Sequence, residues 1–293
     1  MRNRAQTGFT LVELVVVILL SGILSVVVMQ FITAPIDVYV DQSRRARLVD
    51  TAQSAIQRLA YDVRRAVPNS IRVGCGGACV EFMRAATGGR YRQSPPGDAL
   101  SFLPGDLDSR FEVVGGISHT ADITTSADPD ACADGTATCV VIYNTGFNGS
   151  DLWNADNRAT LTALNAGPPV TLEFDNSRFA GGQTAFPAQS PGQRFFLTDT
   201  AVTYLCDPVG GSIRRYWGYS PRAAQTDVDS HSELLALANP AEHALVADKA
   251  AVCQFSYAPG TPTRNAVLTA RLAVTEAGES ITLLEQISVS NLP

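Results

Sequence analysis

The chain has 293 residues, with 28 acidic residues against 22 basic ones and a formal net charge of −6. This length allows one sizeable domain or two small ones. The acidic balance argues against nucleic acid as the main partner, because phosphate binding needs a concentrated basic surface.

The first thirty residues follow a distinctive order. A short leader with Arg2 and Arg4 and no acidic residue is followed by Gly8-Phe-Thr-Leu-Val-Glu-Leu14, and residues 14–28 carry no charge. A secretory signal peptide would instead be cut after its apolar core. The segment resembles the N-terminus of type IV prepilins and of the pseudopilins of type II secretion. The resemblance implies cleavage after Gly8 by a prepilin peptidase, N-methylation of Phe9 and retention of the apolar segment.

Glu13 stands at the start of the apolar segment. A carboxylate in lipid is costly and marks a functional position by default. We expect it to pair with the free amino group of Phe9 on a neighbouring subunit, which would set the register of an assembly in a medium of low dielectric constant. The alternative is a plain signal anchor whose glutamate lies at the membrane interface.

A long helix is predicted from Phe9 to about Val67. Its membrane part ends near Ile32, and Pro35 is expected to kink or loosen it. The second part is amphipathic, since apolar residues recur every three or four positions before Pro68 ends the helix. The recurring residues are Leu48, Ala52, Ile56, Leu59, Val63 and Val67.

The rest of the chain reads as short strands separated by turns. The expected strands are 71–73, 80–83, 100–103, 111–114, 139–143, 170–174, 194–197, 202–205, 213–219, 252–257, 266–274 and 281–289. Glu276–Glu279 predicts the turn of a hairpin between the last two. One further helix is possible at residues 230–245, and residues 115–138 and 144–169 are expected to be surface loops.

These elements predict an α+β fold in which the amphipathic helix lies on an antiparallel sheet. We expect a leader at 1–8, a transmembrane and assembly helix at 9–34, the amphipathic half of the helix at 35–68, and a β-rich periplasmic head at 69–293. The leader arginines favour a cytoplasmic N-terminus. The protein is therefore expected in the inner membrane with a single span, and later in a pilus or pseudopilus.

Six cysteines occur as Cys75/Cys79, Cys132/Cys139 and the more distant Cys206/Cys253. Disulfides are the default outside the cytoplasm. Six cysteines allow fifteen full pairings, of which we expect the sequential one. Zinc is the alternative at Cys75 and Cys79, although no histidine lies near any pair.

A second, patchier resemblance is carried by Arg194–Thr198, Val202–Cys206, Arg215–Tyr219 and the terminal segment 283–293. These segments are similar to the large minor pilins of the MshO, PilW and pseudopilin J types. The resemblance implies a non-enzymatic subunit that joins or primes a thin filament. Its partners would be other minor pilins, the major pilin, the prepilin peptidase and the inner-membrane assembly platform.

Catalytic chemistry has little support in the sequence. Ser230-His231-Ser232-Glu233 contains a hydroxyl, an imidazole and a carboxylate, but adjacent residues rarely converge as a catalytic triad does. His119, His231 and His243 begin no metalloprotease motif, and no nucleophile elbow or phosphate-binding loop is present. We expect no cofactor, and a membrane-tethered enzyme is the least favoured function.

Two segments are candidates for binding. Asp128, Asp130 and Asp134 cluster carboxylates that Ca²⁺ would accept, but their spacing is not that of an EF-hand. A second candidate surface contains arginines beside aromatic residues, which are typical of interface anchors, although strand alternation would bury part of it. Its residues are Arg214, Arg215, Tyr216, Trp217 and Tyr219. This surface and the long loops support the alternative function of a tip adhesin or ligand-binding module.

Overall fold

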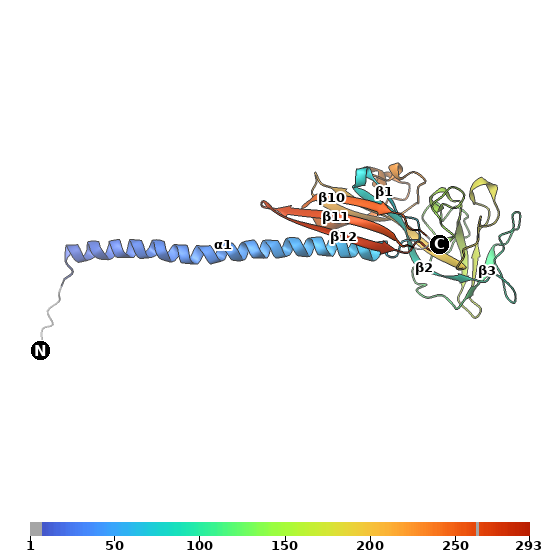
Figure 1. Cartoon of the computed structure of the whole chain (residues 1–293), viewed down its shortest axis with the longest axis horizontal. Helices are drawn as coiled ribbons and strands as arrows, with labels where there is room; N and C mark the ends of the chain where they lie inside the picture. Colours follow the sequence, from blue (N-terminus) through green and yellow to red (C-terminus); the bar gives the residue numbers. More distant parts are fainter. Residues whose placement is uncertain (1–7, 262–263) are drawn as a thin grey trace. The chain divides into compact units, whose positions relative to one another are not determined.

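The computed structural model describes residues 8–261 and 264–293. They divide into two compact units, residues 1–49 and residues 50–293. We call the second the head unit. Helix α1, Leu11–Val63, supplies the N-terminal unit and enters the head unit with its last turns (Figure 1). The fold class is α+β, as predicted.

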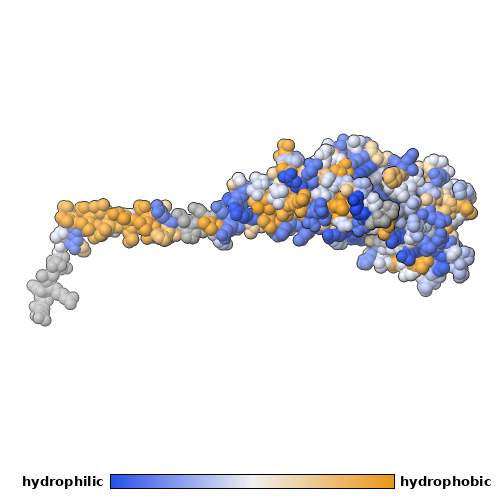
Figure 2. Space-filling model, viewed as in Figure 1, coloured by the Kyte–Doolittle hydropathy of each residue, from blue (hydrophilic) through white to orange (hydrophobic). Residues whose placement is uncertain are grey.

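Helix α1 begins with an apolar segment. Residues Leu11–Phe31 have a mean hydropathy of 2.9, none is buried, and the segment is long and apolar enough to cross a membrane (Figure 2). The helix continues through Pro35 as a single element, so this proline does not end it. Its end at Val63 lies close to the predicted end.

The last turns of α1 form one side of the core of the head unit. Ala52, Ile56, Leu59 and Val63 are buried at the predicted three- and four-residue spacing, while Gln53 and Gln57 on the opposite face are exposed. Ile56 and Leu59 line a small internal space together with Phe255 and Leu272 of the C-terminal strands. Helix packing on a sheet therefore accounts for the amphipathic pattern.

Nine strands form one antiparallel sheet. The order of strands in this sheet is β1-β2-β3-β6-β5-β4-β7-β8-β9. Strand β2 pairs with β7 as well as with β1 and β3. This extra pairing closes a ring of strands β2, β3, β6, β5, β4 and β7. The strands are β1 Arg72–Gly74, β2 Cys79–Tyr91, β3 Arg110–Val114, β4 Cys139–Ile142, β5 Arg158–Asn165, β6 Thr171–Phe174, β7 Arg194–Asp207, β8 Ser212–Tyr219 and β9 Glu242–Asp248.

The ring is filled by side chains. Phe111 packs against Tyr91, Phe174 and Phe195, with ring centroids 5.2–6.3 Å apart, and all four rings are buried. Leu161, Leu172 and other aliphatic residues complete this cluster. The ring is thus a small packed barrel, in which inward-facing residues alternate with outward-facing ones.

Three further strands form a separate antiparallel sheet, β10-β11-β12, with bounds Ala250–Ala258, Ala266–Glu276 and Glu279–Val289. The predicted hairpin is confirmed between β11 and β12. Its two loop residues, Ala277 and Gly278, both have positive φ angles, 49° and 84°, as the favoured two-residue hairpin turns require.

Several predicted elements were wrong. Residues 100–103 form no strand, and the predicted strands 194–197 and 202–205 are one strand, β7. Residues 144–169 were expected to be a surface loop, yet they contain β5, and Leu152 and Trp153 are buried. Helix α2 covers only His231–Ala236, and the end of the predicted helix belongs to β9, which begins at Glu242 and pairs with β8. Short 3-10 helices lie at Cys75–Gly77, Leu152–Asn154, Ala180–Gly182 and Gln225–Asp227.

All six cysteines are joined in sequential pairs, as expected. The bonds of Cys75 with Cys79 and of Cys132 with Cys139 close short loops. The bond between Cys206 and Cys253 spans 47 residues and links β7 of the large sheet to β10 of the small one. In the chain-entropy model this long loop is worth about 4 kcal/mol.

A buried ion pair ties α1 to the large sheet. The Asp62 carboxylate, 1% exposed, accepts hydrogen bonds from Arg215 Nε at 2.5 Å and from the Tyr204 hydroxyl at 2.8 Å. Burial and the nearby Asp62 charge raise the pKa of Tyr204, so this hydroxyl stays protonated as a donor. One guanidinium nitrogen of Arg215, Nη2, has no partner in the described structure.

We predict that Asp62→Ala lowers the free energy of unfolding by about 3–5 kcal/mol, because it leaves the Arg215 charge buried without its partner. The double variant Asp62→Ala/Arg215→Met should cost less than the sum of the two single changes. Thermal or denaturant unfolding, followed by tryptophan fluorescence, measures both. Asp50→Ala removes an exposed carboxylate from the same helix and should stay within about 0.5 kcal/mol of the parent. Additive costs in the double variant would show that the pair is not coupled.

Candidate functional site

The N-terminal site begins just before helix α1. Gly8, Phe9 and Thr10 precede the first helical residue, Leu11, and the Phe9 side chain is 82% exposed. The peptide bond between Gly8 and Phe9 therefore lies in a non-helical segment. The rest of the predicted leader, residues 1–7, lies outside the described residues.

Thr10 caps the helix. Its Oγ1 accepts a hydrogen bond from the backbone N–H of Glu13 at 3.3 Å, which satisfies one of the amides that a helix N-terminus leaves open. Threonine followed three residues later by glutamate is also the sequence pattern of a capping box. This role of Thr10 was not predicted, although Thr10 and Glu13 have the spacing of a capping box in the sequence.

Glu13 is the only charged residue in Leu11–Phe31, and it is exposed. It lies in the first helical turn, where the helix dipole favours a negative charge. Within the same segment, the Ser25 hydroxyl donates to the Ser21 carbonyl at 2.7 Å, so this hydroxyl is satisfied inside its own helix. The segment therefore presents an apolar surface with one carboxylate near its beginning.

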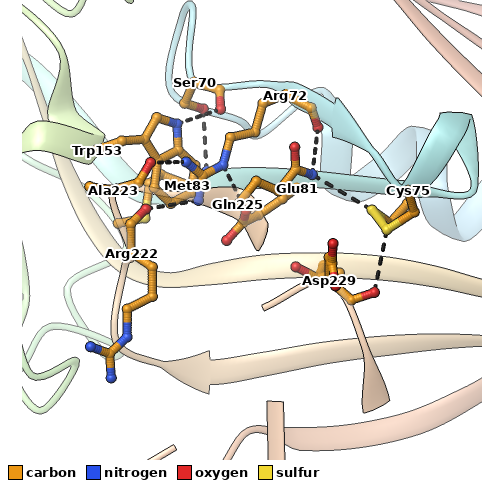
Figure 3. Close-up of polar contacts among 12 residues, drawn as sticks. Ser70, Arg72, Cys75, Glu81, Met83, Trp153, Arg222, Ala223, Gln225 and Asp229 are labelled. Atoms are coloured by element: carbon orange, nitrogen blue, oxygen red, sulfur yellow. Dashed lines mark hydrogen bonds and ion pairs between the residues drawn. A yellow bond between two sulfur atoms is a disulfide. The ribbon is translucent and has the colours of Figure 1, made fainter. Parts of the chain in front are cut away.

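A second polar centre, in the head unit, surrounds Arg72 (Figure 3). The Arg72 guanidinium donates from Nε to Glu81 at 2.7 Å, and its other nitrogens donate to the carbonyls of Ala223 and Arg222 at 2.7 and 2.8 Å. It also lies 3.8 Å from the centroid of the Trp153 ring. One arginine thus joins β1, β2 and the segment that follows β8.

The partners of Arg72 are themselves fixed. Glu81 is fully buried and also accepts from the Tyr219 hydroxyl at 2.9 Å. Burial raises the pKa of Glu81, while Arg72 and the Tyr219 hydrogen bond act in the opposite direction. The Trp153 indole N–H donates to the Ser70 carbonyl at 3.0 Å. These hydrogen bonds join residues of the head unit to one another, so this centre holds the fold together.

The predicted arginine and aromatic surface is mostly interior. Arg215, Tyr216 and Tyr219 are at most 5% exposed, and only Arg214 and Trp217 are partly accessible. Tyr219 bonds Glu81 and Thr203, and Arg215 bonds Asp62. Three of the five residues are therefore held in internal networks, as strand alternation predicted for part of the set, and only Arg214 and Trp217 are left for a possible interface.

The predicted triad-like segment is a helix cap. Ser230 Oγ accepts from the Glu233 N–H at 3.4 Å, and the Glu233 carboxylate accepts from the Asp229 N–H at 3.2 Å. The hydroxyl and the carboxylate are thus engaged in capping α2. His231 instead contacts Tyr216, 2.8 Å away, so the three groups do not act on one another.

The carboxylates considered for calcium do not converge. Asp128 accepts from the backbone N–H of Asp130, and the Asp130 carboxylate pairs with Arg178 at 2.8 Å. Within the described ranges, no group of three or more histidine, cysteine or acidic side chains is arranged to hold a metal ion. Cys75 and Cys79, considered for zinc, are joined in a disulfide bond.

Comparisons with known proteins bear on the N-terminal site only. No curated protein and no solved structure matches the chain. A family model described as the prokaryotic N-terminal methylation motif matches residues 3–29, which include Gly8, Phe9 and Glu13. Together with the single apolar helix that follows, this match supports a type IV prepilin-like protein anchored in a membrane by its N-terminal helix.

Proposed function

We propose that this chain is a minor pilin or pseudopilin, a non-enzymatic subunit that joins or primes a type IV pilus or a type II secretion pseudopilus. The observation that carries the proposal is the order of elements at the N-terminus. The methylation motif matches residues 3–29 and so covers the cleavage site and most of the exposed apolar segment Leu11–Phe31, and the single charged residue of that segment, Glu13, lies in its first turn.

Each part of the N-terminal segment has a role in this proposal. The prepilin peptidase cleaves after Gly8 and methylates Phe9. Residues 9–34 then anchor the protein in the inner membrane and later pack in the filament. Glu13 pairs with the amino group of Phe9 on a neighbouring subunit. In lipid or in a filament core this pairing relieves the cost of an isolated carboxylate.

The size of the head unit favours a position at or near the tip. Residues 50–293 form a packed unit with two sheets, and so large a head disfavours dense packing along a shaft. We therefore place the chain in a priming complex with other minor pilins. The major pilin and the inner-membrane assembly platform are its further partners, and the head lies in the periplasm. The MshO, PilW and pseudopilin J types are the subfamilies we favour.

The alternatives of an adhesin and of an enzyme have less support. The adhesin rested on the long loops and on the arginine and aromatic segment, and that segment is largely buried. The enzyme rested on Ser230, His231 and Glu233, of which the serine and the glutamate cap a helix.

We predict that the mature chain begins at Phe9 and carries one additional methyl group. Gly8→Val should abolish cleavage, because a side chain of that size is not expected to fit the peptidase. A Cβ at Gly8 meets no atom within 4 Å in the chain itself, and the same holds at Gly22. Gly22→Ala is therefore a matched control that should be processed normally. Intact-mass measurement of membrane-extracted protein distinguishes the forms, and a chain beginning beyond residue 25 would contradict the proposal.

We predict that Glu13→Gln leaves a processed, membrane-inserted protein whose incorporation into the assembly falls about tenfold or more, equivalent to at least about 1.4 kcal/mol. The amide removes the charge but keeps the size of the side chain. Ser25→Ala is the control, since that hydroxyl bonds only its own helix. Crosslinking to other pilins and recovery in sheared filaments measure incorporation. Normal incorporation of Glu13→Gln would rule out the pairing with Phe9.

We predict that deletion of the chain reduces the number of filaments, or of secretion-competent complexes, and that the full chain co-purifies with another minor pilin from detergent-solubilised membranes. The membrane helices raise the effective concentration of the heads, so their direct contacts are expected to be weak. Electron microscopy of surface filaments and crosslinking before solubilisation provide the two measurements. Normal filaments that fail to adhere would favour the adhesin.

A further inference from the structure

Three rings in the head unit meet at a place that the proposed function does not use. Tyr216 and His243 are direct partners on the neighbouring strands β8 and β9, and their ring centroids are 5.7 Å apart. His231, the first residue of α2, brings a second imidazole to the same place. The chain has only three histidines, and two of them converge here from separate elements.

The geometry of the two imidazoles suits a shared metal ion. The centroids of His231 and His243 are 5.4 Å apart and their planes are inclined by 80°. Zinc binds an imidazole nitrogen at about 2.0–2.1 Å, so the metal lies roughly 3 Å from the centre of each ring. Two imidazoles bound to one tetrahedral zinc ion therefore have ring centroids about 5 Å apart. The observed centroid separation therefore matches that of two imidazoles bound to one ion.

The nitrogens needed for binding are accessible. His231 Nδ1 lies 2.8 Å from the Tyr216 hydroxyl, so this contact engages one nitrogen and leaves Nε2 free. No described residue forms a hydrogen bond with the His243 imidazole, and both histidines are exposed. Ligand histidines usually hold their second nitrogen in a hydrogen bond that fixes the ring, and Tyr216 supplies that contact for His231.

We infer that His231 and His243 form a binding site for a borderline divalent transition-metal ion, represented by Zn²⁺ and Cu²⁺, in which Tyr216 is a positioning residue for His231. Imidazole suits both ions, and Cu²⁺ should bind more tightly than Zn²⁺. Because no third histidine, cysteine or acidic ligand converges there within the described chain, water completes the coordination. The site is independent of the proposed role in filament assembly.

A bound ion would join α2 to strand β9. The two ligands lie twelve residues apart in sequence, on either side of Asn239-Pro240. An ion that binds the folded head unit and not the unfolded chain raises its apparent stability. Metal binding should therefore raise the thermal unfolding temperature of the wild-type protein.

The test uses the untagged full chain in detergent, titrated calorimetrically with ZnCl₂ in a non-chelating buffer. Wild type should bind one equivalent. His231→Gln and His243→Gln should each lower the affinity for Zn²⁺ at least tenfold. Both variants should still be folded, with all six cysteines in disulfide bonds and the near-ultraviolet circular dichroism of wild type. His119→Gln is the matched control, because His119 lies in a loop and its ring contacts only Ser118. It should bind as wild type does.

Two further readouts separate this site from non-specific binding. The electron paramagnetic resonance spectrum of bound Cu²⁺ should show two nitrogen ligands in wild type and one in either glutamine variant. Tyr216→Phe should retain the site but weaken Zn²⁺ binding by about tenfold; unchanged affinity would overturn the role of Tyr216. Absence of binding by wild type, or binding by the His231→Gln and His243→Gln variants that equals that of wild type, would overturn the site.

Discussion

The pairing of β7 with its neighbours is the constraint on which the head unit depends. One edge of β7 pairs with β2 over Cys79–Arg90, and the other edge pairs first with β4 and then with β8. This single strand therefore closes the barrel at one end and extends into the open sheet at the other. Phe195 and Leu197 of β7 point into the barrel cluster, whereas Ala201 belongs to the second core cluster.

Closure of the ring requires a bent β2. The register between β2 and β7 shifts between Arg84 and Thr87, and such irregularities increase local twist and let a sheet coil. Gly88 and Gly89 follow at once. A Cβ at Gly88 would lie 2.8 Å from the Phe195 carbonyl oxygen, and one at Gly89 would lie 2.9 Å from the Phe195 ring. The two glycines thus let the backbones and the Phe195 ring approach closely.

The length of β2 explains why the barrel was not predicted from the sequence. Periodicity predicted α1, the C-terminal hairpin and most strands, because those elements bury one face each. The predicted strand 80–83 covers only part of β2, which runs from Cys79 to Tyr91. The barrel could not be foreseen without the full length of this strand. In the same way β5 was missed, since its role depends on partners, β4 and β6, that sequence distance does not reveal.

The candidate site residues also divide into those set by a local motif and those that depend on partners distant in the sequence. Gly8, Phe9 and Glu13 were proposed from a local motif, and local order is all that such a motif needs. The arginine and aromatic segment was misread because the partners of Arg215 and Tyr219 are Asp62 and Glu81, more than 130 residues earlier. A charged side chain is seldom fully buried unless it is paired. Asp62 and Glu81 fit that rule, but no spacing in the sequence predicts that Arg215 and Arg72 are their partners.

The exposed surface of the N-terminal helix sets the last constraint. Every residue from Leu11 to Phe31 is exposed in its own unit, and an apolar surface of this extent is unfavourable in water. Lipid or the apolar helices of other subunits would cover the aliphatic side chains equally well. The two environments differ at Glu13, since lipid offers no cation, whereas the proposed assembly would supply the amino group of a neighbouring Phe9. Under the proposed function, the carboxylate of Glu13 would be tolerated at the end of a membrane helix and better paired in the assembly. This difference would favour transfer of the helix from the membrane to the assembly.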